Sequence, residues 1–429
     1  MNQKFEAIVV GAGPAGAACS YTLAKAGVQT LLVERGKFPG SKNMWGGVLY
    51  GPILNQFFPR FWEEAPVERF ISRHKFSILT SDSSLSTEFF TQKFSQPPYH
   101  GFSLLRSKFD RWLAGKAAQA GAIVASGLKV DDLLWEKKKV AGIKAGGDEI
   151  PAEVVIACDG VNSLLAEKAG LKKRFLPQEV KQAVKEVIQL SPQLIEQRFN
   201  LRGEEGLAWE FIGSFTQGVP GGAFIYTNKA SLSVGVVVQL SGLAEKKIKA
   251  DDMLEKFKSH PQIKPFLADG NLSEYSAHLI PAAGPSKLLS LYTNGFLVAG
   301  DAASMVITTG LILEGAKLAL ASGLAAAKTV IKAREKGDFS SQTLSLYPRL
   351  LKETFVLKDL HTFKKAYHFL ENPRLYHTYP EIACELAAKI LSHEEQPRKK
   401  AWKLAKEAAK GRLSWWQVIK DLRNLKESL

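Results

Sequence analysis

The sequence predicts an α/β fold with three parts: a parallel sheet, a second lobe rich in β-strands that is inserted into it, and a helical C-terminal region. Three observations support this prediction. An apolar strand at residues 8–10 runs into a glycine turn and an alanine-rich helix, two later apolar strands end in acidic turns, and short strands separated by turn residues fill the stretch between them. The 429 residues are 45% hydrophobic and 23% charged, an ordinary globular composition with room for two or three lobes.

The turn after the first strand has the glycine spacing of a phosphate-binding loop. Gly11 allows a tight turn, Gly13 lets the backbone approach a pyrophosphate, and Gly16 lets the helix and strand pack closely. The next strand, residues 30–33, ends in Glu34, 18 residues after Gly16. An acid about 20 residues beyond such a loop binds a ribose hydroxyl. The pattern indicates a dinucleotide cradle and leaves NAD, NADP and FAD open.

Further segments are expected to reach the same ligand. The glycine-rich loop at residues 35–47 has too little periodicity for a helix or strand, and Arg106 opens an amphipathic helix from which an arginine could reach the phosphates. The strands at residues 154–157 and 296–299 end in acidic glycine turns, Asp159-Gly160 and Gly300-Asp301. Such strand ends line the crevice in which open α/β sheets bind their ligands.

The second lobe is expected to form an antiparallel sheet that covers the cofactor. Its strands include residues 209–213, 222–226 and 231–238. Trp209 and Tyr226 are candidates for lining a substrate pocket there, with core packing as the alternative for both. The eight histidines are scattered, so no catalytic acid or base is assigned.

The three cysteines, Cys19, Cys158 and Cys384, lie far apart and form no CxxC pair. Neither a disulfide framework nor a four-cysteine iron–sulfur site can be built from them, and no metal site is predicted. The chain opens without a basic-then-apolar signal, since a strand of the cradle begins near Phe5, and this predicts a cytoplasmic protein.

The chain carries a formal charge of +15, and residues 397–429 contribute ten Lys or Arg against three Asp or Glu. This tail predicts two helices: a basic one with Trp402, and a second one whose capping box begins at Ser414 and whose apolar stripe includes Trp416. Such a hairpin suits peripheral contact with an anionic membrane. A basic face packed on the body or on an acidic partner is the alternative. Nucleic-acid binding is disfavoured, because no recognised binding module appears.

The order of these motifs resembles that of glutathione-reductase-type FAD proteins of the hydroxylase and geranylgeranyl-reductase branch. Within this branch, four segments are similar to FixC-type electron transfer flavoprotein:quinone oxidoreductases: residues 42–50 (KNMWGGVLY), 105–110 (LRSKFD), 221–228 (GGAFIYTN) and 278–281 (HLIP). The resemblance implies a Rossmann FAD-binding domain of the glutathione-reductase type, an inserted antiparallel sheet that forms the quinone site, and a C-terminal helical region.

The resemblance also implies which residues hold FAD. Glu34 would bind the adenosine ribose, the backbone of Val130 the adenine, and Asp301 the ribityl and pyrophosphate end, while residues 42–47 and the amides of residues 309–311 would flank the flavin ring. The expected FAD contacts are Gly11, Gly13, Pro14, Ala15, Gly16, Glu34, Arg35, Lys42, Asn43, Met44, Gly46, Gly47, Arg106, Val130, Asp159, Gly160, Gly300, Asp301, Thr309, Gly310 and Leu311.

The chain departs from the family in two ways. Val48 stands where many FixC relatives have arginine, and no cysteine-rich ferredoxin segment follows Cys384. The resemblance therefore implies a separate ferredoxin-like iron–sulfur subunit as a partner, with a two-subunit electron transfer flavoprotein as the electron source. The acceptor would be a membrane quinone, expected to be menaquinone, in a complex that could bifurcate electrons at the cytoplasmic face of the membrane. A flavin suits this role because it exchanges single electrons with a cluster and delivers two to a quinone.

Two alternative functions remain open from the sequence: a geranylgeranyl-reductase-like enzyme that saturates prenyl double bonds, and a flavin relay subunit with no small substrate of its own. The sequence also predicts the domain boundaries. The FAD-binding domain comprises residues 1–67, 99–177 and 276–330, the β-rich domain comprises 68–98 and 178–275, and the helical region comprises 331–429.

Overall fold

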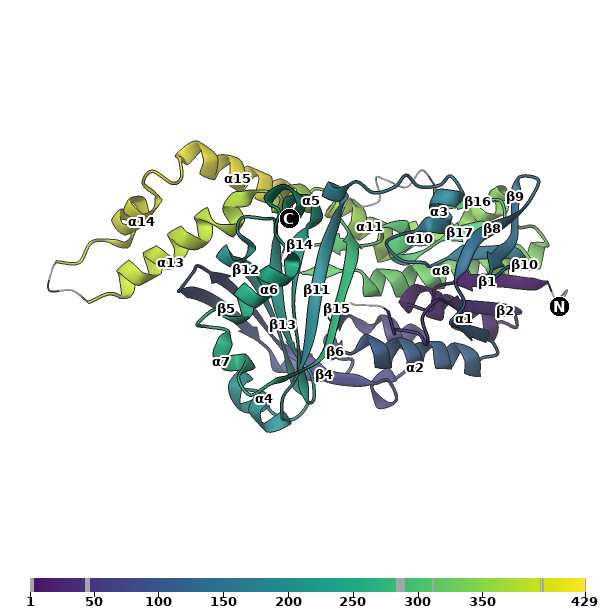
Figure 1. Ribbon diagram of the computed structural model, residues 1–429, viewed down its shortest axis with the longest axis horizontal. Helices are drawn as coiled ribbons and strands as arrows, with labels where there is room; N and C mark the ends of the chain where they lie inside the picture. Colours follow the sequence, from purple (N-terminus) through teal and green to yellow (C-terminus); the bar gives the residue numbers. More distant parts are fainter. Residues whose placement is uncertain are drawn as a thin grey trace.

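The computed structural model describes residues 4–42, 47–282, 290–310, 312–393, 395 and 397–428. Its first sheet is built around β1 (Phe5–Val10), which pairs in parallel with β10 (Asp148–Ala157) and β2 (Thr30–Glu34) (Figure 1). The strand order is β16-β17-β10-β1-β2-β7, and β8 and β9 extend the sheet beside β10. The remaining bounds are β7 (Ile123–Ser126), β8 (Val130–Glu136), β9 (Lys139–Ala145), β16 (Tyr292–Thr293) and β17 (Phe296–Val298).

Helices pack on this sheet and bury its apolar strands. α1 (Pro14–Lys25) lies against α8 (Ala316–Lys336) and α2 (Arg106–Gln119). The two backbones of α1 and α8 touch at Gly323, where a β-carbon would lie 2.2 Å from the Ala15 carbonyl oxygen. The first hydrophobic core therefore joins segments from the beginning and the last third of the sequence.

The second sheet has the order β15-β11-β14-β13-β12-β4-β6-β3, with β5 beside β4. Its strands are β3 (Val48–Tyr50), β4 (Val67–Leu79), β5 (Ser84–Phe90), β6 (Gly101–Leu104), β11 (Val180–Gln189), β12 (Glu205–Gly213), β13 (Gly221–Thr227), β14 (Ser231–Gln239) and β15 (Asn271–Pro281). The sequence predicts an antiparallel sheet, and all pairings are antiparallel except β12 with β4. These two strands come from separate inserted segments, so no hairpin constrains their directions. β3 and β6, from segments assigned to the FAD-binding domain, also join this sheet.

One face of the second sheet carries its own core. Alternate residues of its central strands, such as Trp209, Phe211 and Ile225, are buried there beneath short helices. α6 packs directly on β11 and β14. These helices are α4 (Pro192–Phe199), α5 (Leu240–Lys246), α6 (Ala250–Lys258) and α7 (Lys264–Leu267). The opposite face of the central strands is left to line the cavity described below.

A helical region follows α8, and α13 and α14 project from the rest of the molecule at the left of Figure 1. Its helices are α9 (Ser341–Leu344), α10 (Leu346–Glu353), α11 (Phe355–Thr362), α12 (Ala366–Leu370), α13 (Thr378–Leu391), α14 (Ala401–Ala409) and α15 (Trp415–Ser428). α3 (Leu164–Lys168), the hairpin β18 (Ile307–Thr308) and β19 (Leu313–Glu314), and seven short 3₁₀ turns complete the described elements. The turns are η1 (Pro52–Gln56), η2 (Phe61–Glu63), η3 (Gln92–Ser95), η4 (Pro177–Glu179), η5 (Ser214–Thr216), η7 (Gly300–Ala303) and η8 (Pro373–Tyr376).

Candidate functional site: a cavity between the two sheets

The glycine turn after β1 has no room for side chains. At Gly11, whose φ is +102°, a β-carbon would lie 2.3 Å from the carbonyl oxygen of Cys158, and at Gly16 it would lie 1.9 Å from the carbonyl oxygen of Gly11. Gly13 is the N-cap of α1 and Pro14 opens the helix, so the free amides of the first helical turn face the cavity beyond β1. This arrangement suits a pyrophosphate.

Glu34 fixes the end of β2 against this turn. Its carboxylate is buried and accepts hydrogen bonds from the backbone amides of Ala12 (3.1 Å) and Gly36 (2.6 Å). Both bonds come from amides that flank the cavity, and Glu34 itself lines it. The acid is therefore held at the position where a ribose hydroxyl can reach it, because a carboxylate has further lone pairs to accept from a ligand.

A cavity of about 310 Å³ lies between the first sheet and the second. Eleven of the FAD contacts expected from the sequence line it: Gly11, Gly13, Pro14, Ala15, Glu34, Arg35, Arg106, Val130, Asp159, Gly160 and Asp301. They come from segments spread over 290 positions of the chain, which the parallel register of β1, β2, β10 and β17 brings to one sheet edge.

The other expected contacts lie elsewhere. Gly16 stands behind the turn in α1, Gly300 packs against Ala15, and Lys42 is exposed. Gly47 is buried beside the Leu104 carbonyl, while Thr309 and Gly310 form the turn between β18 and β19. Asn43, Met44, Gly46 and Leu311 lie outside the described residues.

Two buried aspartates, Asp159 and Asp301, line the cavity. Burial raises the pKa of Asp159 to about 6, although the Leu165 amide donates to its Oδ2 at 3.1 Å. Its Oδ1 is buried with no hydrogen-bond partner among the described residues, which leaves an acceptor for a ligand hydroxyl. Burial also raises the pKa of Asp301, and the positive charges of Arg106 and Lys172 oppose this shift.

Arg106 is held by α2 itself. Its guanidinium donates to both carboxylate oxygens of Asp110, with Nε 2.8 and 2.9 Å and Nη2 2.5 Å from the oxygens. The Asp110 side chain is fully buried, and the pair orients the arginine at the cavity wall. The positive charge suits the phosphates of a dinucleotide.

The opposite wall comes from the second sheet. It presents Ala183, Phe224, Tyr226, Val237, His278 and Ile280 to the cavity. The rings of Phe224 and Tyr226 stack with centroids 4.8 Å apart, and burial lowers the pKa of His278 to about 4, so this histidine is neutral. Such a wall is apolar with few polar groups, as ligand pockets commonly are.

The two substrate candidates from the sequence have different surroundings. Tyr226 lines the cavity. Trp209 points to the other face of β12, is fully buried in the second core, and donates from Nε1 to Ser77 Oγ at 2.7 Å. Adjacent strand residues face opposite sides of a sheet, so a tryptophan inside a strand pattern cannot be assigned to a side from sequence alone. Tyr50, for which no role is predicted, also lines the cavity.

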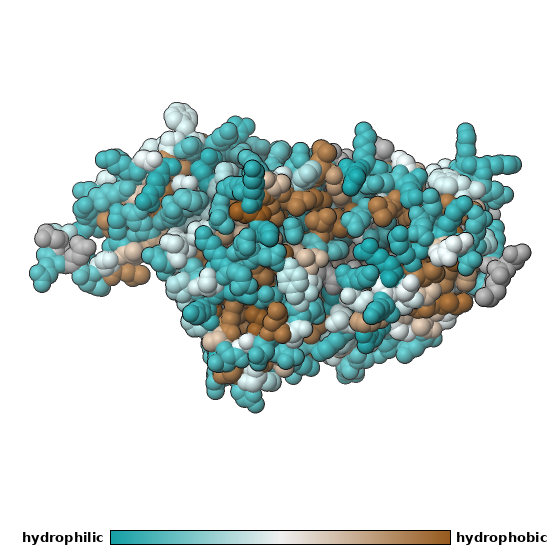
Figure 2. Space-filling model, viewed as in Figure 1, coloured by the Kyte–Doolittle hydropathy of each residue, from teal (hydrophilic) through white to brown (hydrophobic). Residues whose placement is uncertain are grey.

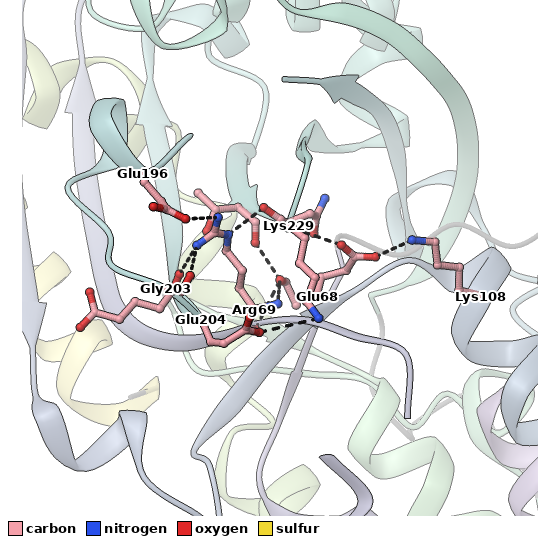
Figure 3. Close-up of polar contacts among 11 residues, drawn as sticks. Glu68, Arg69, Lys108, Glu196, Gly203, Glu204 and Lys229 are labelled. Atoms are coloured by element: carbon pink, nitrogen blue, oxygen red, sulfur yellow. Dashed lines mark hydrogen bonds and ion pairs between the residues drawn. The ribbon is translucent and has the colours of Figure 1, made fainter. Parts of the chain in front are cut away.

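A polar network around Arg69 fixes the strands of this wall (Figure 3). Arg69 is buried on β4; its Nε donates to the Asn228 carbonyl (2.9 Å) and its Nη1 to the carbonyls of Gly203 (2.7 Å) and Glu205 (3.0 Å). Next to it, Glu68 accepts from Lys108 at 2.8 Å, which ties β4 to α2. Asn228 in the GGAFIYTN segment thus has a structural position beneath the wall.

The basic tail forms two helices, and its capping box is present. The Gln417 amide donates to Ser414 Oγ (3.3 Å), and the Ser414 amide donates to Gln417 Oε1 (2.8 Å). The apolar stripe is exposed: Trp416 is 82%, Leu422 58% and Ile419 54% accessible. In Figure 2 this end of the molecule is mostly hydrophilic, with hydrophobic residues interspersed.

Two negative findings concern the described part of the chain. No cluster of three or more His, Cys, Asp or Glu side chains there could hold a metal ion. No helix within the described ranges is long and apolar enough to cross a bilayer.

Two family models match the chain. The FAD binding domain model matches residues 4–195, and the ETF-QO/FixC family C-terminal domain model matches residues 366–428. The cofactor predicted from the motif resemblance, FAD, is confirmed. The second model covers the tail, a segment beyond the region on which the resemblance was recognised.

Relatives match over almost the whole chain. Protein FixC of Escherichia coli O157:H7 is 45% identical over 388 residues, 90% of both chains. The probable electron transfer flavoprotein-quinone oxidoreductase YdiS of Escherichia coli K12 is 41% identical over 420 residues, 98% of both. Among solved structures, a geranylgeranyl bacteriochlorophyll reductase-like protein from Thermoplasma acidophilum superposes with a TM-score of 0.73 at 22% identity over 99% of each chain, which shows the shared fold.

Identity at this level over this length, together with the FAD cradle, confirms the resemblance found in the sequence. The chain belongs to the FixC/electron transfer flavoprotein-quinone oxidoreductase family of FAD-dependent oxidoreductases.

Proposed function

We propose that the chain receives electrons from a two-subunit electron transfer flavoprotein, through a separate ferredoxin-like iron–sulfur subunit, and passes them to a membrane quinone, with menaquinone as the expected acceptor. The observation that carries this proposal is the cavity itself. One wall has the glycine turn and acids of an FAD cradle, and the other is an apolar, aromatic surface that suits a quinone ring. Bound FAD would supply the redox chemistry, because a flavin handles both one- and two-electron steps.

The residues of the chain would bind and orient the two ligands. We place the pyrophosphate at the backbone amides of Gly13 and Ala15 with Arg106 beside it, the ribose at Glu34, and the adenine at Val130. Asp301 would hold the ribityl end of FAD, and the buried Oδ1 of Asp159 would offer the ribityl hydroxyls a second hydrogen-bond acceptor. The second sheet would exclude water from the flavin ring and present Tyr226 to the quinone.

The cysteine arrangement supports the proposal of a separate iron–sulfur subunit. Cys19 and Cys158 are buried in the first core and Cys384 is buried in α13, so none of them is placed to ligate a cluster with the others. We expect the purified chain to show a flavin spectrum without cluster absorption. Affinity purification from cells, followed by mass spectrometry, should recover a ferredoxin-like subunit and both flavoprotein subunits; recovery of neither contradicts the proposed partners.

The test of the acceptor uses the flavin as its own reporter. Anaerobically reduced holoprotein is mixed with a short-chain menaquinone, and flavin reoxidation is followed by stopped flow. We expect reoxidation far faster than in buffer without an acceptor. Equal rates with and without the quinone contradict the proposal, whereas saturation of a prenyl double bond with no quinol formed would favour the geranylgeranyl-reductase-like alternative.

We further propose that the tail holds the protein on the cytoplasmic face of the membrane. α14 and α15 combine exposed tryptophans with lysines and arginines, and rings of this kind sit at the boundary between headgroups and acyl chains. Trp415→Ser combined with Trp416→Ser should release the protein from vesicles of phosphatidylglycerol and phosphatidylcholine. Trp135→Ser, at a half-exposed tryptophan on β8, is the matched control and should leave co-sedimentation unchanged. Unchanged binding of the double variant contradicts the membrane role.

A further inference from the structure

An acid and two phenols of the second sheet lie close together beside the cavity. Tyr50 of β3 and Tyr226 of β13 line the cavity. Glu210 of β12 pairs directly with Phe224 of β13, and the Phe224 and Tyr226 rings stack, so Glu210 lies on the same face as Tyr226. Neither Glu210 nor Tyr50 is among the site residues expected from the sequence.

Two buried polar atoms of this cluster lack hydrogen-bond partners among the described residues. The Tyr50 hydroxyl and Glu210 Oε1 are both buried, and neither has a hydrogen-bond partner in the described part of the chain. Tyr50 is 8% exposed. Unsatisfied buried groups are rare in native proteins, and at the wall of a cavity they indicate a ligand.

The surroundings of Glu210 favour its neutral form. Burial raises its pKa to about 8, and the neighbouring Tyr226 hydroxyl only partly opposes this shift. Burial also raises the pKa of Tyr226 and the pKa of Tyr50, and the charge of an ionised Glu210 adds to both shifts. At neutral pH the cluster therefore holds a carboxylic acid beside two phenols, and each carries a proton that it can donate.

Two histidines connect this cluster to the surface. The His74 ring on β4 stacks near the Tyr50 ring with centroids 5.9 Å apart, and the exposed His100 ring lies 5.7 Å from His74. His74 Nε2 is buried and has no partner among the described residues. Burial and then the His100 charge lower the pKa of His74 to about 4, so its ring stays neutral with one donor and one acceptor nitrogen.

Charged groups on a neighbouring hairpin and helix face the same cluster. Glu314 of β19 and Lys317 of α8 form an ion pair of 2.7 Å. The Glu314 charge acts on both Tyr50 and His100, and the Lys317 charge acts on His100. The rings of His100, His74 and Tyr50 thus form a column that lies near the Glu314–Lys317 ion pair and reaches the cavity at Tyr50.

We propose that Glu210 and Tyr226 donate protons to the quinone bound in this cavity, and that His100, His74 and Tyr50 carry replacement protons from solvent. This inference rests on the proposed function, because only an acceptor that takes up protons needs such groups. Reduction of a quinone to a quinol consumes two electrons, supplied by the reduced flavin, and two protons, one for each carbonyl oxygen.

The first proton leaves the Glu210 carboxyl through the Tyr226 hydroxyl, and one new O–H bond forms on the quinone. The second proton enters from solvent along the column, and the same column then returns a proton to Glu210. The sum is one quinone, two electrons and two solvent protons converted to one quinol, with Glu210 unchanged at the end.

The test separates electron transfer from proton transfer. Holoprotein is reduced anaerobically, and flavin reoxidation is followed with two acceptors: a short-chain menaquinone, which takes up protons, and ferricenium, which takes up one electron and no proton. Glu210→Gln should slow reoxidation by the quinone about 100-fold, a typical effect of losing a general acid, and leave reoxidation by ferricenium unchanged. Tyr226→Phe should act in the same direction.

The pH dependence provides a readout that a purely structural role would not change. Because Glu210 loses its proton near pH 8, the wild-type rate with quinone should fall as the pH rises through that value, whereas Glu210→Gln should be flat there. Glu210→Asp should recover part of the rate. Tyr275→Phe is the matched control, since this exposed tyrosine on β15 donates to Asp251, outside the cavity, and it should match wild type with both acceptors.

The outcomes distinguish this inference from the function on which it rests. If wild type reduces the quinone and Glu210→Gln does so within twofold, the inference is wrong and the proposed function stands. An equal loss with quinone and ferricenium also overturns it, since the residue then affects the flavin rather than a proton. If wild type reoxidises with ferricenium but not with any quinone, the proposed function itself fails.

Discussion

The tail helix α15 is anchored to the body by one buried carboxylate, and Asp421→Ala tests that anchor. Asp421 Oδ2 accepts from Arg374 Nε (2.8 Å) and from the Tyr379 hydroxyl (2.7 Å), and its Oδ1 accepts from Arg374 Nη2 (2.6 Å). Burial alone would raise the pKa of Asp421, but these hydrogen bonds hold it below its usual value. The anchor is therefore fully charged at neutral pH and weakens only as the pH falls through that lowered pKa.

The free energy lost when Asp421 is removed depends on how deeply the Asp421–Arg374 ion pair is buried. Breaking a buried ion pair by deleting one partner costs about 3–5 kcal/mol. The Asp421 side chain is 6% exposed but that of Arg374 is 27% exposed, so water partly solvates the remaining guanidinium, and we take about 2–3 kcal/mol. Each 1.4 kcal/mol is a factor of ten, so the population with α15 detached should rise roughly 30- to 150-fold.

Hydrogen exchange of the α15 amides measures this population directly, because detachment exposes them without global unfolding. The expected result is loss of protection in α15 with the first sheet unaffected. Glu427→Ala is the control: its ion pairs with Lys365 and Arg423 are exposed, and such pairs contribute about 0–1 kcal/mol. Unchanged α15 protection in Asp421→Ala refutes the view that this carboxylate holds the helix.

Two further predictions concern the cradle and the wall of the cavity. Gly16→Ala places a β-carbon 1.9 Å from the Gly11 carbonyl oxygen, so we expect the purified variant to lack flavin absorbance. Gly27→Ala, at an open position after α1, tests the effect of a substituted glycine away from the cavity. A Gly16→Ala variant that purifies with bound flavin contradicts the role of this turn as the FAD cradle. Arg69→Met removes three hydrogen bonds that a buried guanidinium donates to backbone carbonyls, and should lower the free energy of unfolding in urea by about 3–5 kcal/mol. The exposed Arg423→Met should cost less than about 1 kcal/mol, and equal stability of the two variants contradicts the role of Arg69.

The cradle was predictable because its signals are local. The turn after β1 requires glycines at fixed offsets, Glu34 follows at a fixed distance, and the acidic turns come directly after apolar strands. The capping box at Ser414 is local in the same way. Parallel pairing of β1 with β2 then follows from their connection through α1, since strand–helix–strand units form parallel sheets. The place of β10 beside β1 does not follow in this way, because β3 to β9 come between β2 and β10.

The opposite wall was less accessible from sequence, because it depends on which face each strand turns to the cavity. Trp209 and Glu210 are neighbours, and the tryptophan is in the core while the acid is on the opposite face of β12, the face it shares with the cavity-lining Phe224. A glutamate inside an otherwise apolar strand was the available signal for Glu210. The parallel pairing of β12 with β4, which places His74 opposite Ala208 of β12, joins two segments more than 100 residues apart, and nothing local encodes it.

The contact of Gly323 with Ala15 has a consequence for biosynthesis. The fingerprint turn leaves the ribosome well before β17 and α8, which complete its sheet and cover its helix and come about 300 residues later. At 5–20 residues per second, the nascent chain waits roughly 15–60 s before this site can close. Flavin loading is therefore a late step of folding, and during the wait the exposed apolar edge of β10 depends on protection from aggregation.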